Sequence, residues 1–189
     1  MNEQLAAAIN GFGVFTSSEI TQVLDRMHLF PVERNAILLE LGQTCQAFHF
    51  IQSGSFRHYC PEDGGDTTLN LWTEQQWALD YQSFAAQKPS RNIIRAMEDS
   101  EVYELSVYQL HHLIELSPAF FQLGKIMGSA IPDDEILNVK LSPVDKYRAL
   151  LDKNPKLLQR FALKHIASYL GITPETLSRV RKKMIEQIS

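Results

Sequence analysis

The segment LKHIASYLGITPETLSRVRKKM, residues 163–184, has the pattern of two short helices joined by a tight turn. Apolar residues recur at helical spacing on both sides of Gly171, so each helix has one apolar stripe that the other can cover. Gly171 stands where a chain commonly leaves a helix in the left-handed conformation. Thr173 and Pro174 are typical of the first residues of the next helix. The segment therefore predicts a helix-turn-helix.

The exposed side of the second predicted helix has the chemistry of a surface that reads DNA. At helical spacing, the face opposite the apolar stripe carries four polar residues: Glu175, Ser178, Arg179 and Lys182. A short helix that presents a guanidinium, a carboxylate and a hydroxyl suits the base edges in a major groove. The plainer alternative is a helical hairpin with a solvated charged face.

The distribution of charge favours DNA binding over this alternative. Residues 145–189 contain ten Lys and Arg against four Asp and Glu, a balance of +6. The preceding 144 residues contain eight against eighteen, a balance of −10, and the two balances sum to the −4 of the whole chain. A basic module attached to an acidic body is expected where only one part of the chain meets polyanionic phosphate.

Length and composition are those of a soluble globular protein with one medium and one small domain. The chain has 189 residues, of which 44% are hydrophobic and 21% charged. Its N-terminus lacks the features of a secretory signal, and no apolar run approaches the ~18 residues of a membrane span, so we expect a cytoplasmic protein. Cys45 and Cys60 are both expected in strands of the same sheet region, without metal spacing, and two buried free thiols are favoured over a redox pair.

The first two thirds of the chain predict an α+β arrangement with a helix over residues 15–27 and then a strand-rich stretch. Short strands are expected at residues 35–41, 47–52, 55–60, 67–72, 92–97 and 102–105, separated by Gly, Asp and Ser. Residues 48–59 have the pattern of a compact hairpin. Several short strands without long intervening helices are typical of a jelly roll, the double-stranded β-helix.

Helical periodicity returns after Ser106 and predicts a long helix. Four apolar residues follow a 3-4-3 spacing that is typical of a helix that pairs with another: Phe120, Leu123, Met127 and Ala130. Packing of this stripe on the sheet is the alternative. Leu137 and Leu141 continue the phase after Pro132, which must bend the helix. We expect a sensor domain over residues 1–115, a dimerisation helix and linker over 116–141, and the helix-turn-helix domain over 142–189.

This order of modules resembles the Crp/Fnr family of bacterial transcription regulators. The most specific segments are residues 166–180 and residues 142–155, which look like the family's helix-turn-helix and the helix before it. The resemblance implies a homodimer on a palindromic DNA operator, in contact with RNA polymerase. It further implies base contacts by Glu175 and Arg179, with Ser178 on the same face, although Pro174 stands where the family often has another Arg. Expected phosphate contacts are Lys164, Thr173, Thr176 and Lys182.

The sensor half departs from the family members that bind cyclic AMP. In those proteins a Gly-Glu pair holds the ribose and an Arg-Ser or Arg-Thr pair holds the cyclic phosphate. Here Glu74 has no Gly before it, and Ser90 occupies the phosphate-Arg position with Arg91 one residue later, on the other face of a strand. We expect an effector other than cyclic AMP, in a pocket formed by Trp72, Glu74, Trp77, Ser90 and Arg91.

Enzymatic functions find little support in the sequence. His49 and His58, with Glu40 or Glu62, could be metal ligands in a jelly roll, but no His-X-His pair accompanies them. No nucleophile motif and no phosphate-binding glycine loop occurs, so no catalytic site, metal or cofactor is predicted. The alternative to a DNA-binding regulator is a small-ligand-binding jelly roll whose helix-turn-helix binds a protein partner.

Overall fold

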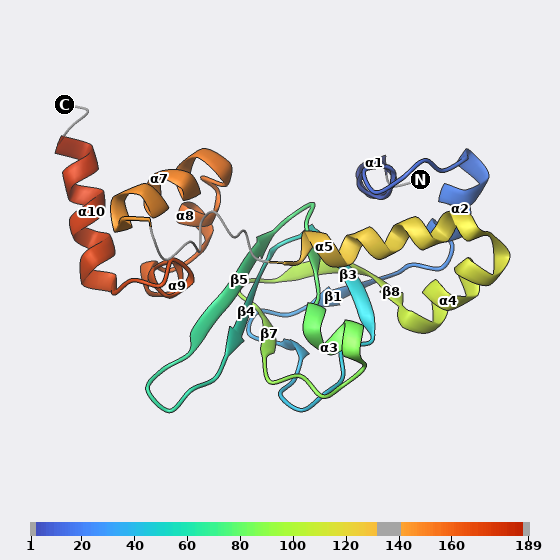
Figure 1. Ribbon diagram of the computed structural model, residues 1–189, viewed down its shortest axis with the longest axis horizontal. Helices are drawn as coiled ribbons and strands as arrows, with labels where there is room; N and C mark the ends of the chain where they lie inside the picture. Colours follow the sequence, from blue (N-terminus) through green and yellow to red (C-terminus); the bar gives the residue numbers. More distant parts are fainter. Residues whose placement is uncertain (1–2, 132–140, 187–189) are drawn as a thin grey trace.

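The computed structural model describes residues 3–131 and 141–186 (Figure 1). Two antiparallel sheets lie in the middle of the molecule, most helices from the first two thirds of the chain lie toward one end, and the C-terminal helices form a separate group at the other end. The chain is therefore built from a sheet-based body and a helical module.

Each sheet has four strands, and neighbours in a sheet are mostly not consecutive in the chain. The first has the order β1 (His28–Val32), β8 (Ser100–Ser106), β3 (Ala47–Ser53) and β6 (Trp77–Ala78). The second has the order β2 (Ile37–Leu39), β7 (Ile93–Ala96), β4 (Ser55–Cys60) and β5 (Thr67–Thr73). This is the jelly roll of the predicted α+β fold, which is confirmed.

The predicted hairpin over residues 48–59 is wrong. Strand β3 pairs with β8 and β6, whereas β4 pairs with β5 and β7 in the other sheet. Gly54 is the single residue between β3 and β4 and has a φ of +101°, and a Cβ there would overlap the Ser100 side chain. A glycine at this corner lets the chain pass from one sheet to the other.

Strands β1 and β6 and the short helix α3 (Tyr81–Ala86) were not among the predicted elements. The cysteines also differ in part from expectation, since Cys45 precedes β3 rather than lying in a strand, and Cys60 ends β4. Both thiols are free; Cys45 is buried and Cys60 is half-buried.

Helices close one end of the sandwich. They are α1 (Glu3–Asn10), α2 (Ser17–Leu24), α4 (Val107–Leu116), the 3₁₀ helix η1 (Pro118–Lys125) and α5 (Ile126–Ser129). Helix α2 begins with a capping box in which Thr16 and Glu19 bond each other's backbone, and Ser106 begins α4 in the same way. Leu5, Ile9 and Leu113 are fully buried in the core that these helices share with the sheets.

The apolar stripe of η1 and α5 faces this core and not a partner helix. Phe120 and Leu123 are fully buried, and Ala130 is 4% exposed, in the same cluster as the sheet residues. The interpretation of this stripe as a pairing seam is therefore wrong, and packing on the body is the observed arrangement. The part of the expected dimerisation helix from Pro132 to residue 140 lies outside the described residues.

The C-terminal module has a core of its own. It consists of α7 (Pro143–Lys153), α8 (Leu157–Arg160), α9 (Leu163–Tyr169) and α10 (Pro174–Glu186). Its fully buried side chains include Leu150, Ile166, Leu170 and Leu177. Leu71 of the edge strand β5 joins this cluster, and Figure 1 shows α8 and α9 beside that strand.

Candidate nucleic-acid interface and ligand cavity

Helices α9 and α10 form the helix-turn-helix, with the local geometry that their sequence predicts. Gly171 has a φ of +64° at the turn, and the backbone N–H of Thr176 donates to the Thr173 hydroxyl at 3.2 Å. Leu177 and Val180 of α10 are buried against α9 and α7. Burial of this side of α10 leaves the opposite side to solvent.

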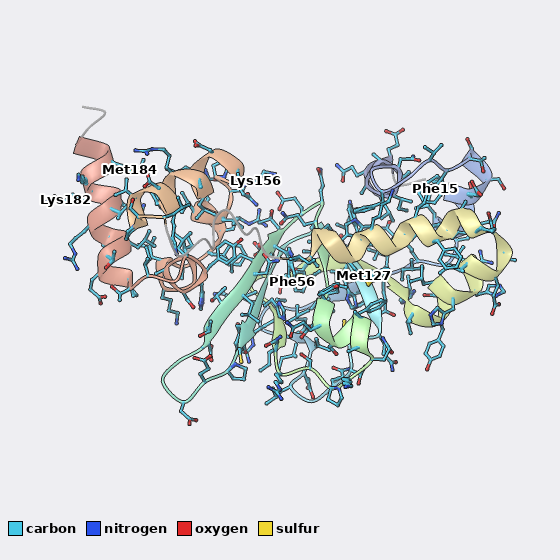
Figure 2. All side chains as sticks on the ribbon, in the orientation of Figure 1. Phe15, Phe56, Met127, Lys156, Lys182 and Met184 are labelled. Carbon is cyan, nitrogen blue, oxygen red and sulfur yellow. The ribbon has the colours of Figure 1, made fainter. Side chains whose placement is uncertain are left out.

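The exposed side of α10 brings together the three predicted base-reading residues and Lys182, a predicted phosphate contact. Glu175, Ser178, Arg179 and Lys182 are all exposed. Figure 2 shows Lys182 pointing away from the module and Met184 pointing toward its interior. The Arg179 Nε lies 3.5 Å from the Glu175 carbonyl oxygen, one turn back. Hydrogen bonds from its own backbone N–H and from the Thr173 hydroxyl hold the pKa of Glu175 below its usual value, so the carboxylate is ionised at neutral pH.

Three of the four predicted phosphate contacts lie at the N-termini of the two helices. Lys164 is exposed at the start of α9, and Thr173 is exposed before α10. Thr176 is half-buried, and its hydroxyl lies 3.1 Å from that of Thr173. Helix N-termini with free N–H groups favour anions such as phosphate.

A buried lysine supports the turn and was not recognised from the sequence. Lys146 of α7 is 7% exposed, and its ammonium donates to the Leu170 carbonyl at the C-terminal end of α9 at 2.9 Å. A cation there offsets the negative end of the helix dipole. Lys146 precedes the buried Leu150 by one helical turn, and this spacing could have predicted that Lys146 lies on the buried face of α7.

A cavity of about 740 Å³ lies between α3, strands β4 and β5, and the end of α5. Two predicted pocket residues, Ser90 and Arg91, line it. The other three lie elsewhere. Trp77 packs on Phe50 in the core, Trp72 stacks its ring on His58, and Glu74 pairs with Lys156 at 3.2 Å.

The polar centre of this cavity is Asp80, which sequence reasoning missed. Its Oδ2 accepts hydrogen bonds from the Ser90 hydroxyl at 2.6 Å and the Asn92 amide at 2.9 Å, and its Oδ1 accepts from the Ser83 N–H at 3.1 Å. Burial raises the pKa of Asp80, but the nearby His58 imidazole and hydrogen bonds from Ser90, Ser83 and Asn92 outweigh it and hold the pKa well below its usual value. Ser90, at the family's phosphate-Arg position, therefore holds a carboxylate.

The two histidines considered as possible metal ligands each lie beside a carboxylate. His49 Nε2 lies 3.1 Å from Glu104, and His58 Nε2 lies 3.6 Å from Asp80. Within residues 3–131 and 141–186, no group of three or more His, Cys, Asp or Glu side chains has the geometry to hold a metal ion. Over the same ranges, no helix is long and apolar enough to span a membrane.

Comparison with known proteins agrees with this architecture. Residues 29–117 match the sequence profile of the cyclic nucleotide-binding domain family. FixK2 of Bradyrhizobium japonicum has 15% identity, with 85% of each chain covered and a TM-score of 0.67. The c-di-GMP-responsive global regulator CLP of Xanthomonas campestris has 21% identity, with 91% of this chain and 93% of CLP covered and a TM-score of 0.63. A transcriptional regulator of the Crp/Fnr family from Eubacterium rectale has 17% identity, 91% and 85% coverage and a TM-score of 0.60.

The chain has the Crp/Fnr fold. This fold agrees with the resemblance predicted from residues 142–180, and residues 29–117, which hold most of the jelly roll, match the family model of the cyclic nucleotide-binding domain. No curated protein sequence matches the chain. Because one fold hosts several functions, the roles of individual residues are argued from their own chemistry.

Proposed function

We propose that this protein is a homodimeric transcription regulator that binds a palindromic DNA operator through α10. The observation that carries the proposal is the pairing of Glu175 and Arg179 on the exposed face of a helix whose other face is buried. The +6 balance of residues 145–189 supplies the attraction to phosphate. The Crp/Fnr fold supports the same function.

The proposed contacts divide between bases and phosphates. Glu175, Ser178 and Arg179 face the base edges, because their side chains are exposed at the middle and start of α10. Phosphates are contacted by the residues at the two helix N-termini and on the outer side of α10: Lys164, Thr173, Thr176 and Lys182. The first group sets sequence preference, and the second sets register and salt dependence.

The dimer is proposed to form on the outward side of η1 and α5. Phe121 is 66% exposed there and Ile131 is 47% exposed, although both are large apolar residues. Gly124 and Gly128 lie between them at a 3-4-3 spacing and permit close approach of a second copy. A two-fold axis along this side would present two α10 helices to successive major grooves, about 34 Å apart.

The cavity around Asp80 is proposed to hold a small-molecule effector other than cyclic AMP. Its volume of about 740 Å³ is within the range of small-molecule sites. An ionised carboxylate that already accepts from Ser90 and Asn92 repels a cyclic phosphate placed beside it.

Selection of bound duplexes from a random pool tests the function directly. A palindrome with half-sites about 34 Å apart is expected, because two-fold symmetry in the protein is mirrored in the operator. Recovery of no preferred sequence, together with salt-insensitive binding, would contradict the proposal and favour a ligand-binding jelly roll whose helical module binds a protein.

A further inference from the structure

The helical module docks on an open sheet edge within the same chain. Strand β5 is the last strand of its sheet, so its outer backbone groups have no strand partner among the residues that the structure describes. Ser168 of α9 bonds one of them and the residue just before the strand, because its hydroxyl accepts from the Thr68 N–H at 2.8 Å and donates to the Asp66 carbonyl at 3.2 Å. The Ser168 side chain thus makes two hydrogen bonds of the kind that a neighbouring strand would make at this edge.

Ion pairs from α8 reinforce this contact. Arg160 bonds the Glu98 carboxylate at 2.6 Å and lies 3.6 Å from Glu74, and the Lys156 ammonium lies 3.2 Å from Glu74. Figure 2 places Lys156 on the side of the module that faces the sheets. Leu71 of β5, 2% exposed, packs into the module's core.

We infer that these polar contacts form an autoinhibitory clamp, which holds the module in a state that binds DNA weakly and which opens when DNA binds. The clamp comprises Ser168 with Thr68 and Asp66, and Arg160 and Lys156 with Glu74 and Glu98. The inference rests on the proposed function. It does not require that α10 be covered, since its base-reading face is exposed in the docked state.

The charges of the paired residues indicate that docking weakens DNA binding. Lys156 and Arg160 are two of the ten basic residues after position 144, and in the docked state both are paired with acids of the body. Docking also places Asp66 beside α9, where both Asp66 and Lys164 act electrostatically on His165. Because Asp66 is paired with Arg57 at 3.0 Å, its carboxylate adds little repulsion there, and the weakening of DNA binding rests on Lys156 and Arg160.

The clamp is weak enough to open. The Lys156 side chain is 61% exposed, Arg160 33% and Glu98 40%, so water and salt screen the ion pairs. Interfaces of this polar kind between domains of one chain commonly open and close. Because DNA binds the open state better, it shifts the population toward that state.

Amide exchange at Thr68 reports the clamp at a single hydrogen bond. In the full-length protein, saturation with a random-sequence duplex at low salt should speed exchange of this N–H by about tenfold or more, because its acceptor leaves. Ser168→Ala should speed the same amide without DNA, whereas the Phe50 amide in the interior strand β3 should not respond. Unchanged Thr68 exchange at saturating DNA overturns the inference.

DNA affinity provides the second readout. Glu74→Gln combined with Glu98→Gln opens the clamp from the body side, and Glu33→Gln combined with Glu101→Gln removes the same charge from exposed acids outside it. The clamp pair should tighten binding to a random-sequence duplex by about tenfold more than the control pair. Equal tightening overturns the inference alone. Absence of DNA binding by every variant overturns the proposed function as well.

Discussion

Two basic side chains on α10, Arg179 and Lys182, should contribute to DNA binding in different ways. Arg179 lies mid-helix on the exposed face, where a guanidinium can bond guanine O6 and N7 together. Arg179→Ala should cost about 1–3 kcal/mol on the selected operator and relax base preference at one position in each half-site. Binding isotherms on the operator and on scrambled DNA measure both effects.

Lys182→Ala is the matched control because it removes the same charge from the same exposed side. As a phosphate contact, Lys182 should contribute similarly to all sequences, and its loss should lower the salt slope by about one unit per contact. If Arg179→Ala weakens binding to both DNAs equally, Arg179 is a phosphate contact and the assignment of the base-reading face is wrong.

Asp80 leads to a prediction about ligand choice. Its carboxylate is ionised and is bonded by Ser90, Asn92 and the Ser83 N–H, so the position of the family's phosphate Arg holds a serine bound to an acid and offers no guanidinium to a cyclic phosphate. Calorimetry with cyclic AMP should therefore give no binding at micromolar concentration. A low-micromolar dissociation constant would mean that Arg91 or another cation reaches the phosphate.

The residues of α9 and α10 were predictable from sequence, whereas Asp80 was not. The helix-turn-helix depends on neighbours within one or two turns, such as Gly171 and Thr173, which periodicity and capping rules describe. Asp80 acquires its role from Ser90 and Asn92, ten and twelve residues later, and from His58 on another strand. Glu74 resembled the family's acid more closely in sequence but is turned toward Lys156.

At the scale of elements, the wrong predictions concern the strand or core against which each element packs. Strands β3 and β4 are separated only by Gly54 and alternate like the arms of a hairpin, yet they enter different sheets. Local spacing cannot reveal this, because strand pairing depends on distant segments such as β8 and β7. The same holds for η1, where apolar residues occur on both sides at Phe120 and Phe121, and only the packing shows which is buried.

This assignment of faces predicts where dimerisation can be broken. Phe121→Asp places a charge on the proposed contact with the second copy and should give a monomer in sedimentation at micromolar concentration, because an unpaired buried charge is costly. Tyr108→Asp is the control, since Tyr108 is 72% exposed on α4, away from that contact. A wild-type protein that is monomeric with and without DNA would contradict the dimer altogether.

At the scale of the whole molecule, an acidic body and a basic module share one chain and touch at β5. The same strand lines the cavity through Thr67 and Leu69 and holds the module through Thr68 and Leu71. Its Asn70 side chain also donates to the Ala130 carbonyl at the end of α5, at 3.2 Å. A displacement of β5 would therefore change the cavity lining, the contact with the end of α5 and the contact with α9 together.

The electrostatics at this junction predict an acid-sensitive fold. Burial, followed by the positive charges of Arg57 and Lys164, lowers the pKa of His165 to about 4, while Asp66 opposes the shift. Between about pH 6.5 and about pH 4 the unfolded chain binds a proton that the folded chain does not, so stability is present above this window and is lost as the pH falls through it. The midpoint of urea denaturation, followed by circular dichroism, should therefore drop across that window in the wild type.

His165→Gln should remove part of this drop, because glutamine keeps a similar size and polarity but does not titrate. His111→Gln, an exposed substitution on α4, is the control and should leave the drop unchanged. Arg57→Gln should act in the same direction as His165→Gln, since loss of the positive charge that lowers the His165 pKa most lets His165 accept a proton more readily in the folded state. An equal acid response in the wild type and His165→Gln would show that other groups govern acid stability, and His165 would have no part in it.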